Sequence, residues 1–175
     1  MHTQIHPQHS FAVQSLLEYL EKEYYIPAAL ACDKLLPAPG SAAEVRPAED
    51  TYLLNVWSTL VAQVQRYIRV RRLSLLPYLH ELAEKEDTGH DCRACTSTCT
   101  IRHAAQLNDI REAHRGIKES LQVLKTATAA PEHFSAEMQR EGDSLRDLLS
   151  EMIYLEETAL IPKISAAQKA IYAHP

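Results

Sequence analysis

Glycine is scarce in this chain, which has four glycines in 175 residues. No asparagine-glycine pair is present, so the sequence lacks the strongest short signal for a β-hairpin. The chain is rich instead in Ala, Leu, Glu, Lys, Gln and Arg, which favour helix over strand. The composition therefore predicts an all-α fold. The length suits a single domain over residues 1–175, because a domain of about 150 residues buries roughly 70% of its unfolded surface.

A basic charge balance is also absent, since the formal net charge is -5. This argues against nucleic acid as a partner, because phosphate-binding domains usually carry a basic face. The basic residues Arg66, Arg69 and Arg72 are interpreted as a solvated helix face, with a phosphate-binding use left open. No apolar run approaches the roughly 18 residues of a membrane span, and the opening "MHTQIHPQHS" lacks a signal-peptide core. We expect a cytoplasmic protein without a membrane partner, and leave open a homo-oligomer or a protein partner.

The usual signatures of an enzyme are missing as well. The sequence has no glycine-rich phosphate cradle, no serine nucleophile elbow and no paired carboxylates for general acid and base chemistry. An enzyme is therefore not favoured, and catalytic residues stay unknown.

Four helical segments follow from capping residues, prolines and apolar periodicity. They are expected after Ser10 towards Cys32, from near Pro47 to about Asp87, over roughly 100–127, and over about 132–170. Four helices with three connections predict a four-helix bundle. The second helix would be roughly 60 Å long if straight, at 1.5 Å per residue. Because that is too long for a compact domain of this size, we expect bends at Pro77 and Pro162, and Pro27 is a further candidate for a kink.

Apolar residues recur at alternating steps of four and three in all four segments, as Leu145, Leu148 and Met152 do in the fourth, which predicts one shared core. Polar or ionisable side chains interrupt or flank these apolar series. Arginine and glutamate are almost never fully buried unless they are paired. The interrupting residues, which every helix supplies, are Tyr24, Tyr67, Arg71, His114 and Glu156.

Two stretches of the chain have a similar pattern of charged and apolar residues, and each ends in a proline at the same position in the pattern. They are "YIRVRRLSLLP" over 67–77 and "MIYLEETALIP" over 152–162. They resemble the phrase His-x-x-x-Glu-Glu-x-x-Leu-Phe-Pro, which occurs twice in the hemerythrin-like, or HHE cation-binding, family. The nearest branch is that of the iron-sulfur cluster repair di-iron proteins. "LLEYLEKEYYIPAAL" and "IREAHRGIKESLQVL" are similar to the first and third helices of that family. The resemblance implies a four-helix bundle with a non-haem di-iron centre that handles oxygen, nitric oxide or iron.

Most of the ligand positions that the resemblance implies have changed residue type. A His-His pair of the family would occupy Tyr24 and Tyr25, and only His114 and Glu156 keep the expected types. The implied positions in this chain are Tyr24 or Tyr25, Tyr67, Arg71, His114, Met152 and Glu156.

Arg71 is the substitution with the largest consequence, because a permanent cation in place of a bridging glutamate repels metal ions. We expect Arg71 to pair with Glu156, and Tyr24, Tyr67 and Met152 to pack around this ion pair. The tyrosine hydroxyls are expected to form a hydrogen-bond network with the pair. His114 is interpreted as a core histidine in the same hydrogen-bond network, and its use as a metal ligand is the alternative.

A rewired centre, with one iron held by Tyr24, Tyr67, His114 and Glu156, is the competing interpretation. Arg71 distinguishes the two. If it points out of the bundle, the cavity is free for metal, and if it contacts Glu156, iron is disfavoured.

A second candidate site lies in the segment "GHDCRACTSTCTIRH". Cys92 and Cys95 have the spacing that lets two thiolates hold one metal. Cys95, Cys99 and His103 are spaced four apart, so they share one helix face if the third helix starts early. Zinc, a redox-active Cys-x-x-C pair and inert reduced thiols are the three alternatives. The candidate ligands are His90, Cys92, Cys95, Cys99 and His103. Cys32 is assigned to the core.

These observations predict a hemerythrin-like protein with a degenerate di-iron site. The expected role is binding, sensing or accessory work in iron, redox or nitrosative stress, with the Cys/His segment as a metal site or thiol switch. A working iron protein with a rewired centre and a purely structural partner-binding bundle are the alternatives.

Overall fold

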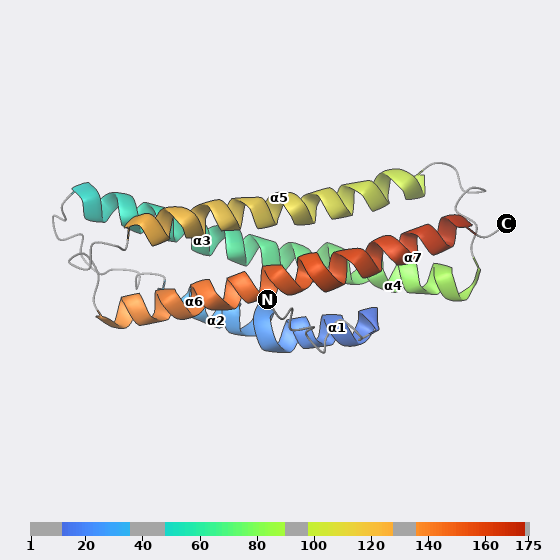
Figure 1. The fold of residues 1–175 in the computed structure, drawn as a ribbon, viewed down its shortest axis with the longest axis horizontal. Helices are drawn as coiled ribbons and strands as arrows, with labels where there is room; N and C mark the ends of the chain where they lie inside the picture. The colour runs from blue at the N-terminus through green and yellow to red at the C-terminus, as the bar shows by residue number, and fades with distance from the viewer. Residues whose placement is uncertain (1–11, 36–47, 90–97, 128–135, 174–175) are drawn as a thin grey trace, which may run out of the picture.

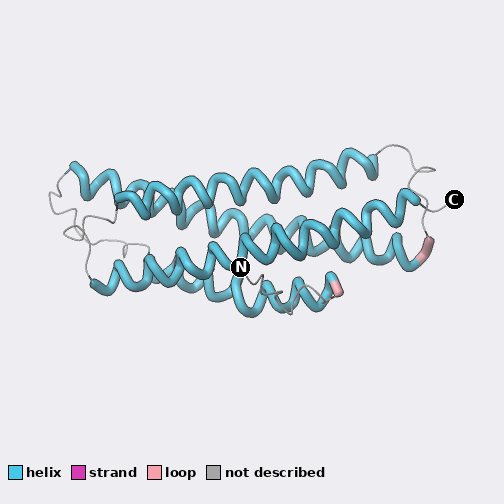
Figure 2. The backbone as a smooth tube through the Cα atoms, in the orientation of Figure 1, coloured by secondary structure: helices cyan, strands magenta, loops and turns pink. Residues whose placement is uncertain are grey.

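The computed structural model describes residues 12–35, 48–89, 98–127 and 136–173, and near several helix ends it describes the backbone alone. These residues form four long helical segments, and the described ranges hold no strand (Figure 2). The segments run in alternating directions and make an elongated all-α bundle (Figure 1). The predicted all-α bundle class is therefore confirmed. Within the same ranges, no helix is both long enough and apolar enough to cross a membrane.

The first segment comprises α1 (Val13–Leu20), η2 (Glu21–Tyr25) and α2 (Ile26–Leu35). The second comprises α3 (Ala48–Val70), η3 (Arg71–Leu75) and α4 (Leu76–Asp87). The third is α5 (Thr98–Ala127), and the fourth comprises α6 (Ala136–Leu155), η5 (Glu156–Leu160) and α7 (Ile161–Ala173). These bounds lie close to those expected from the sequence. Ser10 and Pro47, the expected start signals, lie outside the described residues.

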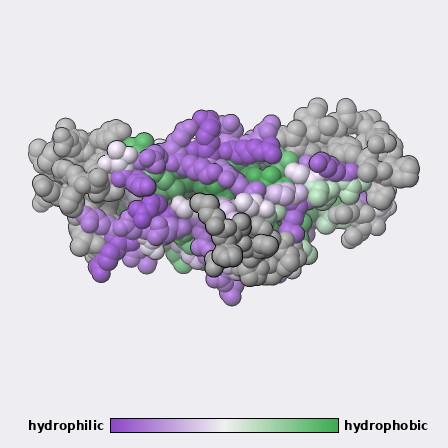
Figure 3. Space-filling view, viewed as in Figure 1, coloured by the Kyte–Doolittle hydropathy of each residue, from purple (hydrophilic) through white to green (hydrophobic). Residues whose placement is uncertain are grey.

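The contacts between the segments define the bundle. Helix α3 packs along α5, α2 packs against both α3 and α6, and α4 packs against α7. Hydrophilic residues cover most of the described part of the face shown in Figure 3, with hydrophobic residues visible between them.

Three of the four segments contain a π-helical turn directly before a proline. In each turn a backbone N–H donates to the carbonyl five residues back: Ile26 to Glu21, Leu76 to Arg71 and Ile161 to Glu156. The next residues are Pro27, Pro77 and Pro162. Proline lacks an N–H and its ring clashes with the carbonyl four residues back in an α-helix, so a wider turn before it relieves both problems. The helices continue through all three prolines.

The bend expected at Pro77 rested on helix length, and the elongated shape of the bundle weakens that argument (Figure 1). The second segment runs without interruption from Ala48 to Asp87. A change of axis direction at Pro77 and Pro162 stays a prediction.

The core formed by the described residues is hydrophobic apart from three buried polar or charged residues. Leu60 and Val64 of α3, Ile117 of α5 and Leu149 of α6 are all buried. The buried polar or charged residues are Arg71, His114 and Glu156, which are 2%, 1% and 0% exposed. Most positions in the predicted apolar series are buried, whereas Leu148 is only partly buried and Leu149 takes the core position beside it.

Candidate functional site

Three of the four helical segments supply the buried charged and polar groups, and the first adds a tyrosine. Arg71 begins η3, Glu156 begins η5, and His114 lies in the middle of α5. The π-helical turn widens the helix by one residue where it presents Arg71 and Glu156, and such turns recur at functional sites. The three side chains meet inside the bundle.

Arg71 and Glu156 form an ion pair. The distance between Arg71 Nη2 and Glu156 Oε2 is 2.5 Å, and neither side chain is more than 2% exposed. Two charges in a site this dry are stable only when they face each other and when hydrogen bonds satisfy their remaining atoms. The structure thus brings together the two residues for which the sequence predicts an ion pair.

Four donors converge on the Glu156 carboxylate. Its Oε2 accepts from Arg71 Nη2 and from the Tyr67 hydroxyl, and it lies 2.5 Å from His114 Nε2. Its Oε1 accepts from the Tyr25 hydroxyl. An ionised carboxylate has about four lone-pair sites. Three of the four donors therefore share Oε2, and Oε1 has one donor among the described residues.

Tyr67 links the members of this network. Its hydroxyl also accepts from Arg71 Nη2 and lies 2.8 Å from His114 Nε2. The Arg71 guanidinium carbon lies 4.5 Å from the centre of the Tyr67 ring, so the cation also contacts the face of the ring. Tyr67 thus contacts three of the charged or polar groups around it, as the hydrogen-bond network predicted from the sequence requires.

The ionisation of the pair follows from its geometry. Burial raises the pKa of Glu156, but the Arg71 guanidinium and hydrogen bonds from His114 and Tyr25 outweigh burial and lower the pKa to about 2. Burial lowers the pKa of Arg71, whereas Glu156 and the tyrosines raise it above its ordinary value. Burial raises the pKa of Tyr25 and of Tyr67 well above the ordinary value, so both stay neutral donors. The centre holds one anion, one cation and two phenols.

Tyr25 rather than Tyr24 supplies the contact to Glu156. Tyr24 is buried, but its ring lies 5.9 Å from that of Tyr19. Burial raises the pKa of Tyr24, and Tyr19 and Glu151 raise it further, which places its hydroxyl beside those residues. The expectation that Tyr24 completes the network is corrected here. The resemblance allowed either Tyr24 or Tyr25 at this ligand position. Tyr25 takes it because the π-helical turn adds one residue, so that Tyr25, five residues after Leu20, shares a helix face with Leu20.

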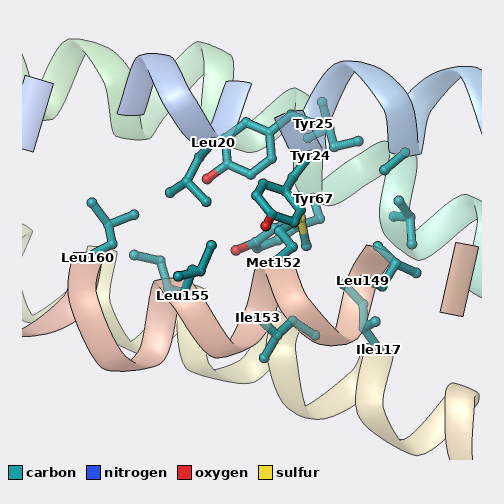
Figure 4. Packing of buried hydrophobic residues seen from close by; sticks show 14 of the residues in the cluster. Leu20, Tyr24, Tyr25, Tyr67, Ile117, Leu149, Met152, Ile153, Leu155 and Leu160 are labelled. Atoms are coloured by element: carbon teal, nitrogen blue, oxygen red, sulfur yellow. The ribbon is translucent and has the colours of Figure 1, made fainter. Parts of the chain in front are cut away.

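Met152 packs near this centre without contributing a polar donor. It is fully buried, and Figure 4 shows it beside Tyr24 and Tyr67. Met152 thus fills space at the position where the resemblance implies a ligand histidine.

Two residues outside the predicted set lie between the hydrogen-bond network and the surface. Glu157 Oε1 lies 3.3 Å from His114 Nδ1, although no hydrogen bond is formed, and Lys118 Nζ lies 2.7 Å from the same oxygen. Glu157 follows Glu156 directly, and Lys118 stands one helical turn after His114. Those two spacings were the signals that the sequence offered.

The second predicted site lies outside the described residues. His90, Cys92 and Cys95 belong to a segment whose structure is not described, and the side chains of Cys99 and His103 in α5 are not described either. Zinc binding or thiol chemistry there stays a prediction. Among the residues whose side chains the structure describes, no group of three or more His, Cys, Asp or Glu is arranged to hold a metal ion.

The other predicted positions have plain surroundings. Cys32 is a buried free thiol, and burial raises its pKa to about 12. Arg66, Arg69 and Arg72 are exposed, and Arg72 forms a surface ion pair with Glu21. These arginines lie on a solvated face.

Comparison of the chain with family models, with curated proteins and with solved structures finds no match. The similarity to hemerythrin-like proteins consequently depends on the residues and spacings given above.

Proposed function

We propose that this protein is a hemerythrin-like bundle in which an internal ion pair has replaced the di-iron centre. Its role is non-enzymatic: binding, sensing or accessory work in iron, redox or nitrosative stress handling. The observation that carries the proposal is the 2.5 Å contact between buried Arg71 and buried Glu156. Bends at Pro77 and Pro162, which the prolines in the sequence predict, belong to the same proposal.

The donor set does not fit a di-iron centre. Iron in such a site needs several imidazoles and bridging carboxylates. Among the described residues, the bundle centre offers one imidazole, His114, and one buried carboxylate, Glu156, which already pairs with Arg71 and His114. A guanidinium in contact with that carboxylate would also repel a metal cation.

The rewired single-iron centre fits no better. It requires Arg71 to point away from Glu156 and Tyr24 to join Tyr67 and His114. Arg71 instead contacts Glu156, and Tyr24 lies beside Tyr19.

The Cys/His segment is the remaining place for metal or thiol chemistry within this proposal. Cys92 and Cys95, with Cys99, His90 and His103 as further donors, would hold zinc or act as a thiol switch. A reducing cytoplasm and a protein partner are the setting in which such thiols would respond to oxidants.

The test is elemental analysis of untagged protein, purified without chelator, together with an absorption spectrum in air. The proposal predicts far less than one iron per chain and no near-ultraviolet oxo-bridge bands. About one iron per chain or more, with those bands, would overturn it.

A matched variant tests the Cys/His segment in the same preparation. Zinc near one per chain that disappears when Cys92 and Cys95 become serine would identify a zinc site. Without zinc, reaction of the two thiols with a nitrosating agent or hydrogen peroxide would identify a switch. Absence of both would remove the Cys/His segment from the proposal.

A further inference from the structure

A cavity of about 410 Å³ lies beside the charged network, between the second helical segment and α5. Tyr67 and Arg71 form part of its wall, so the cavity borders the ion pair. A volume of this size falls in the range of sites for small organic molecules.

Arg71 has hydrogen-bond donors that the protein leaves unused. Nη2 serves Tyr67 and Glu156, whereas Nε and Nη1 are buried and have no partner among the described residues. A buried N–H without an acceptor is unfavourable, and more so on a charged group. Arg71 lines the cavity while its Nε and Nη1 are almost fully covered, so a small rotation of the side chain would bring one of them to an acceptor placed in the cavity and relieve this cost.

About half of the residues in the remaining wall of the cavity are apolar, and the others are polar or charged. Val70 and Leu75 contribute from the second segment, and Ile110 and Ala113 from α5. Gly116 completes this wall, and its missing side chain leaves room next to Gln63. The apolar half of this wall suits a hydrocarbon body rather than a small inorganic anion.

Charges of both signs surround the cavity. Arg66 supplies a second cation, and Asp109 and Glu112 supply two carboxylates, of which Glu112 is paired with Arg115. The carboxylates oppose a polyanion by like-charge repulsion. A ligand with a single negative charge is the best match.

We propose that this cavity binds a small organic monocarboxylate, with its carboxylate directed to the unused donors of Arg71 and its hydrocarbon part against Val70, Leu75 and Ile110. This inference rests on the proposed function as a binding protein, and it names the ligand class. Arginine suits the role because its guanidinium serves Glu156 through one nitrogen and a second carboxylate through another.

The experiment is isothermal titration calorimetry with a straight-chain series from butanoate to octanoate, with 1-hexanol and inorganic phosphate as separate titrants. The proposal predicts saturable binding of one carboxylate per chain, and no saturable binding of 1-hexanol or phosphate. Absence of saturable binding across the carboxylate series would overturn it. Equal binding of 1-hexanol would show that Arg71 is not used, and tight phosphate binding would show a different ligand class, so either result also overturns it.

Gly116 provides matched variants that leave the ion pair untouched. Gly116→Leu fills the cavity, whereas Gly116→Ala adds a single carbon with its nearest neighbour, Gln63 Nε2, at 3.6 Å. Carboxylate binding should weaken at least tenfold in Gly116→Leu and stay unchanged in Gly116→Ala, with circular dichroism confirming that both fold. Equal binding in Gly116→Leu would place the carboxylate elsewhere and contradict the proposal.

Metal content separates this inference from the proposed function. Low iron content without carboxylate binding would contradict the proposed ligand class and leave the proposed function standing. Stoichiometric iron would remove the proposed function, whatever the calorimetry shows.

Discussion

Arg71 and Glu156 occupy equivalent places in two separate helices and meet in the centre of the bundle. Each is the first residue of a π-helical turn. The two residues after each turn are Leu76 and Pro77 in one helix, and Ile161 and Pro162 in the other. Their side chains approach to 2.5 Å between Nη2 and Oε2. The two similar phrases of the sequence thus present opposite charges at the same structural position, and the charge reversal between them neutralises the centre.

Acid should weaken the folded state through Glu156. Its pKa is about 2 in the folded protein against an ordinary 4.5, so its contribution to stability is complete above pH 4.5 and is lost as the pH falls towards 2. The contribution is on the order of 3 kcal/mol. Urea denaturation of the wild type and of Arg71→Met/Glu156→Gln at several pH values measures it. The stability gap between them should narrow over this window, and parallel profiles would contradict the assignment.

Removal of the Tyr25 hydroxyl should destabilise the fold more than removal of the Tyr24 hydroxyl. Tyr25→Phe takes a donor from buried Glu156 and should cost about 1–3 kcal/mol. Tyr24→Phe is the matched control, because the Tyr24 hydroxyl lies near Glu151, which is exposed. Chemical denaturation of both variants tests the assignment. A larger loss for Tyr24→Phe would show that the wrong tyrosine has been placed at the centre.

Cys32 should be unreactive in the folded protein. It is fully buried and its pKa is raised to about 12, so almost no thiolate forms near neutral pH. With Cys92, Cys95 and Cys99 replaced by serine, Ellman's reagent should label one thiol per chain in urea and almost none without it. Rapid labelling under native conditions would be inconsistent with a core position.

Substitution by alanine should stabilise the protein at one helix glycine and not at another. At Gly116 a new Cβ meets only Gln63, so Gly116→Ala should stabilise by up to about 1 kcal/mol through helix propensity. At Gly142 the new Cβ would lie 3.0 Å from the Trp57 ring, which must shift. Gly142→Ala should therefore lose this gain and change the Trp57 fluorescence. Equal stabilisation by both substitutions, with unchanged fluorescence, would contradict the close packing of Gly142 on Trp57.

Helix positions and the buried faces could be predicted from the sequence because they depend on local periodicity and on proline and capping residues. The ion pair could be anticipated because the resemblance implies a shared site for Arg71 and Glu156, and because a buried arginine and a buried glutamate each require a partner.

The choice of Tyr25 over Tyr24 could not be predicted in this way. A count in steps of three and four from Leu20 leads to Tyr24, whereas the π-helical turn over Glu21–Tyr25 adds one residue and turns Tyr25 to the core. The cavity beside Arg71 was beyond prediction for another reason. It depends on how Gly116 and Ala113 of α5 face the second segment, which is a matter of three-dimensional packing.

The most direct test of the central claim is a double-mutant cycle between Arg71 and Glu156, measured by urea denaturation at neutral pH. Arg71→Met alone leaves a buried carboxylate unpaired and should cost about 3–5 kcal/mol, and Glu156→Gln alone should cost a similar amount. Arg71→Met/Glu156→Gln should cost much less than the sum, with a coupling energy of about 2 kcal/mol or more. Additive losses, with a coupling within about 0.5 kcal/mol of zero, would contradict an ion pair at the centre of the bundle.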